Sequence, residues 1–416
     1  MITIPKLKIN QIDINKITDF KDIVFKDNYD YLRFFWNKPK EIEIAGIDFS
    51  LKNEYYNVKE FNRLAQHYRN ILEENNHLFE KIEIPLIFII NSFDNESIGN
   101  RYPWTELPSG IIFIPKKIYI KRNDALKLIT ISNKNAPNKV NKHILNDTRS
   151  VNKSKKLNST FINMIDQSMP LINNNEVSKV VLSRQKKIEF NFSIKKQSLF
   201  LSKAELNFPQ CTTFLYDFKD QGIFFGVTPE TLFKTKQKQF YTEALAGTFQ
   251  PNEDLNSLDR SKEIDEHNFV VDYINDKISK FSSDIDFTNI PFLLKLDSIT
   301  HLKTEFKSTL KSKIDPFNII HKLHPTPAVC GTPTKVAMQI IRTLESHNRG
   351  WYSGTLGWID NNYNSHFIVS IRSGLSIDKN LFIYAGCGIT KNSNKEKEYH
   401  ESEIKFNSIL SILNDE

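Results

Sequence analysis

Two short segments of the sequence each carry a pair of glutamates at helical spacing. Glu263 and Glu266 lie three residues apart, and Glu398 and Glu401 repeat that spacing near the C-terminal end. Residues three apart share one face of a helix, and Lys405 follows Glu401 one turn later. Carboxylates that converge from two helices can hold Mg2+, with water and substrate oxygens completing its octahedron. From spacing alone, a solvated helix face remains the commoner interpretation.

Glycine-rich strand ends and one arginine give a second indication of a ligand site. The segments 385–388 and 246–248 end two predicted strands, and their glycines let backbone N–H groups come close to a carboxylate. Arg372 is a charged residue inside the otherwise apolar predicted strand 366–376. A buried arginine needs an anionic partner. A substrate carboxylate would serve, and so would an internal Asp or Glu.

The elements that must position these residues are predicted to alternate between strands and helices. Strand-like runs cover 41–50, 84–90, 111–120, 179–190, 222–233, 240–249, 351–360, 366–376 and 381–389, and helix-like stretches cover 59–80, 261–281, 334–345 and 395–413. The stretch 261–281 carries an apolar stripe of Ile264, Val271, Ile274, Ile278 and Phe281. Several strands follow each other through short turns, which favours a largely antiparallel α+β arrangement. Pro115 interrupts the run 111–120 and weakens the prediction there.

Composition and charge exclude several classes of function. The 416 residues carry a net charge of +7, but the basic residues are scattered, and the one dense stretch, 133–156, has the composition of a solvated linker. No RNA-type aromatic motif or Cys/His finger spacing supports nucleic-acid binding. The N-terminus lacks the apolar core of a signal peptide. No run approaches the ~20 apolar residues of a membrane span.

The cysteines indicate a reducing compartment. Cys211, Cys330 and Cys387 are odd in number and far apart, which suggests neither a disulfide framework nor a zinc site. A cytoplasmic location fits this pattern best.

Nine segments of the chain, in order, resemble those of the chorismate-utilising enzymes, a family that includes isochorismate, salicylate, anthranilate and aminodeoxychorismate synthases. They are 179–184, 228–230, 242–248, 266–267, 323–329, 352–358, 371–372, 385–389 and 398–401 with Lys405. The resemblance implies an α+β fold with large, mostly antiparallel β-sheets packed in a sandwich and helices outside. Residues 158–416 would form the chorismate-binding catalytic part and 1–150 the variable N-terminal part of one integrated domain.

The resemblance also implies the ligands of the site. In the family, Mg2+ lies between two glutamates and the ring carboxylate of chorismate. These glutamates correspond to Glu266 and Glu401, with Glu263 and Glu398 as outer or water-mediated partners. The implied substrate-binding set is Thr242, Ala246, Gly247, Thr248, His301, Ala328, Tyr352, Arg372, Gly386, Gly388 and Lys405. For His301, a purely structural role stays open.

A few positions favour the isochorismate-forming branch of the family. Lys179 stands where isochorismate and salicylate synthases have a lysine that acts as general base on water, and where anthranilate synthases tend to have Gln. Ala246 stands where aminodeoxychorismate synthases carry a nucleophilic lysine. Glu230 is the expected general acid, which requires a raised pKa. Ala328 resembles the small residue of isochorismate synthases and carries less weight.

The expected activity is therefore conversion of chorismate to isochorismate, with Mg2+ as cofactor, no glutamine amidotransferase subunit and a monomeric chain. The product can feed menaquinone or a catechol siderophore. Salicylate synthase is the nearest alternative, and a non-catalytic binding module is an alternative of another class. The departures from the family are small: Cys330 replaces a Ser or Gly, and Cys387 replaces the usual Ala between Gly386 and Gly388.

Overall fold

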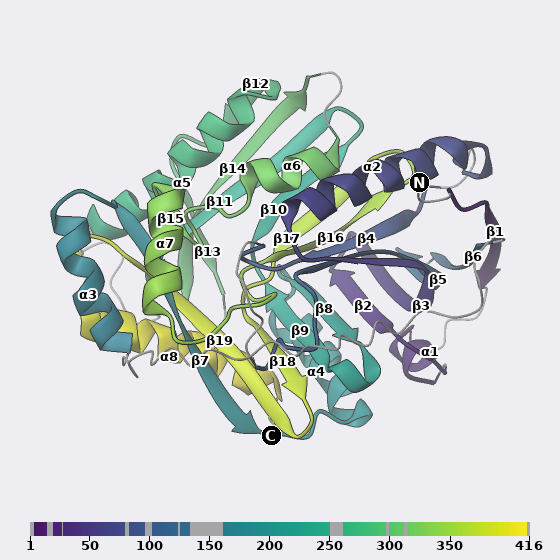
Figure 1. The fold of residues 1–416 in the computed structure, drawn as a ribbon, viewed down its shortest axis with the longest axis horizontal. Helices are drawn as coiled ribbons and strands as arrows, with labels where there is room; N and C mark the ends of the chain where they lie inside the picture. Colours follow the sequence, from purple (N-terminus) through teal and green to yellow (C-terminus); the bar gives the residue numbers. More distant parts are fainter. Residues whose placement is uncertain are drawn as a thin grey trace.

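The computed structural model describes residues 4–14, 20–26, 28–79, 83–95, 102–123, 125–133, 161–249, 261–296, 299–311 and 315–413 (Figure 1). The helices are α1 (Phe20–Lys26), α2 (Val58–Glu74), α3 (Phe161–Asn173), α4 (Ile194–Asn207), α5 (Ser261–Ser279), α6 (Pro316–Leu323), α7 (Thr334–Leu344) and α8 (Lys395–Leu413). The strands are β1 (Leu7–Ile14), β2 (Arg33–Lys38), β3 (Ile42–Tyr55), β4 (Pro85–Asn91), β5 (Gly110–Arg122), β6 (Ala125–Asn133), β7 (Lys179–Glu189), β8 (Thr212–Asp217), β9 (Ile223–Thr228), β10 (Thr231–Lys236), β11 (Gln239–Phe249), β12 (Ser282–Phe287), β13 (Phe292–Lys295), β14 (Thr300–Leu310), β15 (Gly331–Thr332), β16 (Thr355–Asp360), β17 (Ser365–Val369), β18 (Ser373–Ile377) and β19 (Asn380–Ile389).

These strands form one continuous antiparallel ladder. From β14 it runs through β11, β10, β17, β16, β4 and β5 to β3, and then through β2, β8, β9, β18 and β19 to β7 and β15. β12 and β13 flank β14, and β6 joins β5 to β1. The predicted α+β class and antiparallel arrangement are confirmed, with the predicted sheets joined into one ladder.

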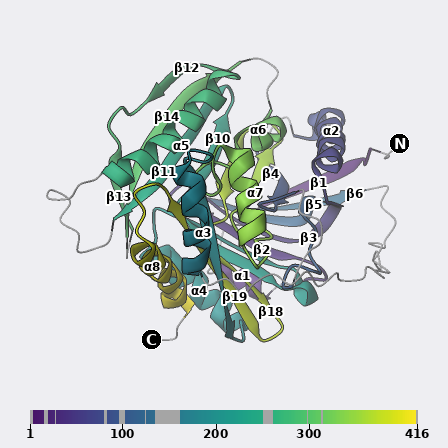
Figure 2. The same ribbon diagram turned by 60° about the vertical axis from the view of Figure 1, so that its left-hand side comes forward.

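Both faces of the ladder are buried, because successive side chains of a strand point to opposite faces. On β2, Phe34 and Trp36 belong to the larger apolar core, whereas Phe35 belongs to a second core. Residues of α1, α4 and α8 cover the second core. Figure 2 shows α3, α7 and α8 on the outside of the strands. A strand that is buried on both faces lacks an alternating pattern, so β2 left no strand signal in the sequence.

The N-terminal and C-terminal parts of the chain share the ladder. β4 pairs with β16, and β2 pairs with β8, so neither part holds a sheet of its own. The predicted linker and the predicted boundary near residue 150 lie almost entirely within 134–160, outside the described residues. No described helix is long and apolar enough to cross a membrane.

Two predicted strands are each divided in two. The run 222–233 forms β9 and β10, with Glu230 in the break between them. The run 366–376 forms β17 and β18, so Arg372 lies between strands rather than inside one, and its φ of 48° is left-handed. The strand predicted at 111–120 is present as β5 despite Pro115, because the facing strand β3 shifts register beside the proline. On α5, Ile264 is exposed, so the predicted stripe is wrong at its first position.

Candidate active site

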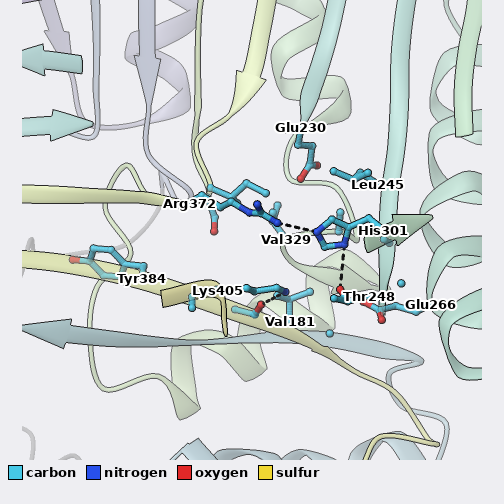
Figure 3. A pocket seen from close by; sticks show the side chains of 18 of the residues that line it. Val181, Glu230, Leu245, Thr248, Glu266, His301, Val329, Arg372, Tyr384 and Lys405 are labelled. Carbon is cyan, nitrogen blue, oxygen red and sulfur yellow. Dashed lines mark hydrogen bonds between the residues drawn. The ribbon is translucent and has the colours of Figure 1, made fainter. Parts of the chain in front are cut away.

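The two ends of the ladder meet around one pocket, which Figure 3 shows from close by. It is lined by Val181, Glu230, Leu245, Ala246, Gly247, Thr248, Glu266, His301, Ala328, Val329, Tyr352, Ser353, Ile371, Arg372, Tyr384, Ala385, Gly386, Gly388 and Lys405. The empty space between these residues, including the part that is open to solvent, is about 690 Å³.

Most of the predicted site residues line this pocket, and five do not. Four of them, Lys179, Glu263, Glu398 and Glu401, belong to the predicted catalytic and metal-binding groups and are not among the lining residues. Thr242 is buried on β11, and its hydroxyl donates to the carbonyl oxygen of Leu232 at 2.6 Å. The structure therefore gives Thr242 a bond within the sheet and no place on the pocket surface.

Lys179 and Glu266 meet over Gly388. Lys179 is fully buried, and its Nζ lies 3.1 Å from Oε1 of Glu266. The contact lacks hydrogen-bond geometry, since Nζ has no hydrogen-bond partner among the described residues. A Cβ on Gly388 would lie 2.2 Å from that same oxygen and 2.8 Å from Cε of Lys179. Glycine is therefore required at position 388, because the amine and the carboxylate fill the space above it.

Gly247 allows α5 to approach the strand that lines the pocket. Its φ is +77°, and the pairing of β11 with β14 shifts register beside it. A Cβ there would lie 2.7 Å from the carbonyl oxygen of Glu263. This close approach brings the first turn of α5, and with it Glu266, to the pocket wall.

Glu230 is held in the break between β9 and β10 by its backbone. Its N–H donates to Oγ1 of Thr228 at 3.2 Å, and its carbonyl oxygen accepts from the N–H of Val369 at 3.1 Å. The side chain is buried and lines the pocket (Figure 3).

The carboxyl group of Glu230 has the electrostatic surroundings of an acid. Burial, together with the charge of Glu243, raises the pKa of Glu230 to about 8, although Lys179 and Lys405 act in the opposite direction. Glu243 is fixed in turn: it accepts from the N–H of Thr231 at 2.7 Å and pairs with Lys303 at 2.8 Å. Glu230 is therefore largely protonated near neutral pH, which a general acid requires.

Arg372 points its guanidinium group into the pocket toward a histidine (Figure 3). Nη2 donates to Nε2 of His301 at 3.0 Å, and Nη1 is buried with no partner in the part of the chain that the structure describes. Burial and the charge of Arg372 hold the pKa of His301 well below its usual range, so the imidazole is neutral. Because Nε2 accepts, the proton lies on Nδ1, which is 3.2 Å from Oγ1 of Thr248. Thus, in the described structure, the guanidinium hydrogen-bonds a neutral imidazole and no carboxylate.

Tyr352 adds an aromatic ring to the pocket wall, and Lys405 adds a positive charge. Tyr352 stacks on Tyr384 with ring centroids 4.9 Å apart. Its hydroxyl would lie 3.0 Å from a Cβ on Gly386, which keeps that residue small. Nζ of Lys405 donates to the carbonyl oxygen of Gly386 at 2.8 Å and lies 2.7 Å from Oε1 of Glu401.

Three carboxylates gather around Lys262. Burial acts to lower the pKa of Lys262, but the negative charges of Glu398, Glu266 and Glu401 outweigh burial and raise it. The three carboxylates therefore lie near the amine of Lys262. Lys262 contacts Oε1 of Glu398 at 2.6 Å, while Oε2 of Glu398 is buried and no described residue bonds to it. Burial would raise the pKa of Glu401, but Lys405 and Lys262 lower it. Oxygen donors of this kind, one of them unsatisfied, fit a hard divalent cation.

Seven pocket-lining residues were missed at the sequence level. They are Val181, Leu245, Val329, Ser353, Ile371, Tyr384 and Ala385. All but Tyr384 fall inside the matched segments, so their neighbours carried a signal. Their small or apolar side chains gave no chemical reason to choose them.

Comparison with known proteins identifies relatives along almost the whole chain. Residues 6–414 match the family model described as "Chorismate binding enzyme". The isochorismate synthase MenF of Bacillus subtilis strain 168 is 27% identical over 426 residues, which cover 92% of this chain and 88% of that protein.

Two solved structures share the fold. The menaquinone-specific isochorismate synthase MenF of Escherichia coli has a TM-score of 0.75 at 21% identity, covering 99% of this chain and 95% of that one. Anthranilate synthase component I of Streptococcus pneumoniae TIGR4 has a TM-score of 0.67 at 19% identity, covering 90% and 93%. The fold thus accommodates more than one reaction, and the choice of reaction depends on the pocket.

Proposed function

Because the chain belongs to the chorismate-binding enzyme family, we propose that it is a magnesium-dependent isochorismate synthase, an isomerase acting on chorismate. The observation that carries the proposal is Glu230. Its buried carboxyl group lines the pocket with a pKa of about 8, and the buried amine of Lys179 lies 3.1 Å from Glu266, another residue that lines the pocket. Loss of a hydroxyl group from one ring carbon requires an acid, and addition of water at another requires a base such as this amine.

Substrate binding would use the unsatisfied cations of the pocket. Nη1 of Arg372 is buried without a partner among the described residues, so a carboxylate of chorismate would satisfy it through a charge-assisted hydrogen bond. Tyr352 and Lys405 both lie beside Gly386 on the pocket wall. The ring carboxylate would be held beside Lys405, next to the carboxylate cluster. The substrate would then be fixed in one orientation before the reaction.

Glu266 and Glu401 would hold Mg2+, with Glu263 and Glu398 as outer partners. When bound, Mg2+ would neutralise the ring carboxylate and polarise the conjugated ring.

The proton transfers fall to Lys179 and Glu230. Lys179 takes a proton from water while the water oxygen forms a bond to C2. The two ring double bonds shift, and the bond from C4 to its hydroxyl group breaks. Glu230 gives its proton to this leaving group, which departs as water. One water enters and one leaves, so substrate and product have the same composition.

We further propose that the enzyme acts alone in the cytoplasm. Lys179 activates water rather than ammonia, so no glutamine amidotransferase subunit is needed, and a monomer is sufficient because the described pocket is built by one chain. The three cysteines are all free, which suits a reducing compartment.

The purified protein should convert chorismate to isochorismate in the presence of Mg2+, as identified by chromatography. No enzyme-dependent pyruvate should form. Salicylate with equimolar pyruvate would instead make the chain a salicylate synthase. Absence of any turnover by the folded, Mg2+-supplied protein would refute the proposal. The variants Lys179→Ala and Glu230→Gln should each keep the fold and lose about 10²–10⁴-fold in kcat.

A further inference from the structure

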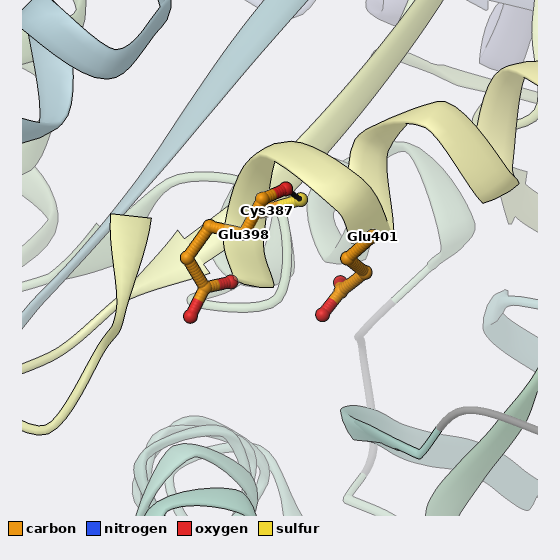
Figure 4. A group of neighbouring side chains, drawn as sticks. All are labelled: Cys387, Glu398 and Glu401. Atoms are coloured by element: carbon orange, nitrogen blue, oxygen red, sulfur yellow. Dashed lines mark hydrogen bonds between the residues drawn. The ribbon is translucent and has the colours of Figure 1, made fainter. Parts of the chain in front are cut away.

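Cys387 places a thiol against the helical turn that carries two of the acidic residues. Its Sγ and carboxylate oxygens of Glu398 and Glu401 all lie within 4.8 Å of one another. The thiol donates to the backbone carbonyl oxygen of Glu398 at 3.2 Å (Figure 4). Because Gly386 and Gly388 face the pocket, Cys387 points to the opposite face of β19, toward α8.

Glu398 adds an unsatisfied donor atom to this group. The side chain is 1% exposed, and Lys262 occupies only its Oε1. Oε2 has no partner among the described residues. Figure 4 shows the carboxyl groups of Glu398 and Glu401 projecting to the same side of α8. A buried carboxylate oxygen without a partner is costly, so this atom is open to a cation.

We infer that Cys387, Glu398 and Glu401 form a second metal site, one that takes a thiophilic divalent cation such as Zn2+. Zinc binds cysteine sulfur at about 2.3 Å and carboxylate oxygen at about 2.0–2.2 Å, so tetrahedral ligand atoms lie about 3.5 Å apart. The three ligand atoms now lie within 4.8 Å of one another, so binding would require them to close to that spacing, with water as the fourth ligand. On binding, the S–H bond of Cys387 breaks, its proton passes to solvent, and sulfur bonds the metal.

The thiol makes this site chemically distinct from the proposed magnesium site. Mg2+ prefers oxygen ligands, and its site combines Glu401 with Glu266 on the pocket face. Zn2+ gains from the thiolate sulfur of Cys387, which is a softer ligand than a carboxylate oxygen. Since Glu401 belongs to both sites, Zn2+ and Mg2+ exclude each other. This competition rests on the proposed function, whereas the binding of Zn2+ does not.

Titration of the full-length protein with Co2+, a spectroscopic substitute for Zn2+, tests the site without an activity assay. The wild type should develop a sulfur-to-cobalt charge-transfer band in the near ultraviolet. Cys387→Ala and the nearly isosteric Cys387→Ser should lack the band and bind Zn2+ about tenfold or more weakly, as for loss of an important metal partner. Glu266→Gln should keep the band and lose the Mg2+ response.

The outcomes separate the two claims. A wild type without the band, or a band that survives in both Cys387 variants, would overturn the thiol site. Equal Zn2+ affinity of wild type and Cys387→Ala would do the same. Failure of the enzyme to turn over chorismate would refute the proposed function and leave the cobalt band unaffected.

Discussion

Arg372 donates its hydrogen bond to a neutral imidazole, that of His301, at 3.0 Å. Its other terminal nitrogen is buried, and no residue in the described ranges accepts a hydrogen bond from it. The protein therefore keeps a buried positive charge that no described carboxylate compensates. Such an arrangement is unfavourable for the free protein and favourable for binding an anion.

Arg372→Met should separate binding from stability. Loss of a charge-assisted hydrogen bond to a substrate carboxylate costs about 1.5–3 kcal/mol, so kcat/KM for chorismate should fall roughly 10- to 100-fold. The melting temperature should stay level or rise, because an unpaired buried charge is removed. Steady-state kinetics and thermal unfolding measure the two effects. A destabilised variant with unchanged kcat/KM would assign Arg372 a structural role.

Glu230 should impose a pH limit on catalysis. Its raised pKa, about 8, keeps the acid protonated below that pH. The kcat/KM for chorismate should therefore be retained below about pH 8 and fall as the pH rises through this value. In Glu243→Gln a neighbouring negative charge is lost, so the pKa of Glu230 should drop and the fall should move to lower pH.

Glu305→Gln is the matched control for that pH profile. Glu305 contacts the same Lys303 at 3.1 Å but is not among the groups that shift the pKa of Glu230. Its profile should match that of the wild type. If Glu243→Gln leaves the alkaline side of the profile in place, Glu230 is not the group that limits the rate there.

Gly388→Ala should abolish turnover and preserve the fold. The added methyl group would lie 2.2 Å from Oε1 of Glu266 and so would force the Lys179–Glu266 pair apart. Gly374→Ala on β18 is the control, since its nearest contacts are 3.0 Å away and outside the pocket. Circular dichroism and turnover distinguish the two variants. An active Gly388→Ala enzyme would show that this pair need not keep its position.

The buried pair Glu345–Arg349 should contribute strongly to stability. Arg349 donates to the carbonyl oxygens of Val181 and Val329, two residues of the pocket wall, at 2.7 and 2.8 Å. Glu345→Ala leaves the arginine charge uncompensated, which costs about 3–5 kcal/mol in the free energy of unfolding. Urea denaturation measures this loss. Removal of the exposed Asp276–Lys280 pair should have little effect, and a comparable loss there would contradict the argument.

The sequence predicted the fold class and most of the long elements, but it failed at two informative places. The runs 222–233 and 366–376 each have the composition of one continuous strand. In the structure each run is interrupted, at Glu230 and near Arg372 respectively. Arg372 has a left-handed φ that composition does not encode. Departures from local preference are expected where a side chain is positioned for function.

Within the site, the resemblance supplied the acidic and basic residues but not their pairing. Lys262 was not singled out, although it lies among three carboxylates, because a lysine beside glutamates on a helix is ordinary. Ile264 was predicted to lie in the core because it fits the helical period. The buried face of α5 instead includes Glu266 and His267, and Ile264 is exposed. Such details depend on contacts between segments distant in sequence.

The most direct measurement is the reaction of chorismate with the purified enzyme and Mg2+ in water labelled with oxygen-18. Addition of water at C2 with loss of the C4 hydroxyl predicts isochorismate that carries one labelled oxygen at C2, as located by mass spectrometry and NMR. Unlabelled isochorismate would mean that the original hydroxyl migrates within the substrate. That result would contradict the roles assigned to Lys179 and Glu230.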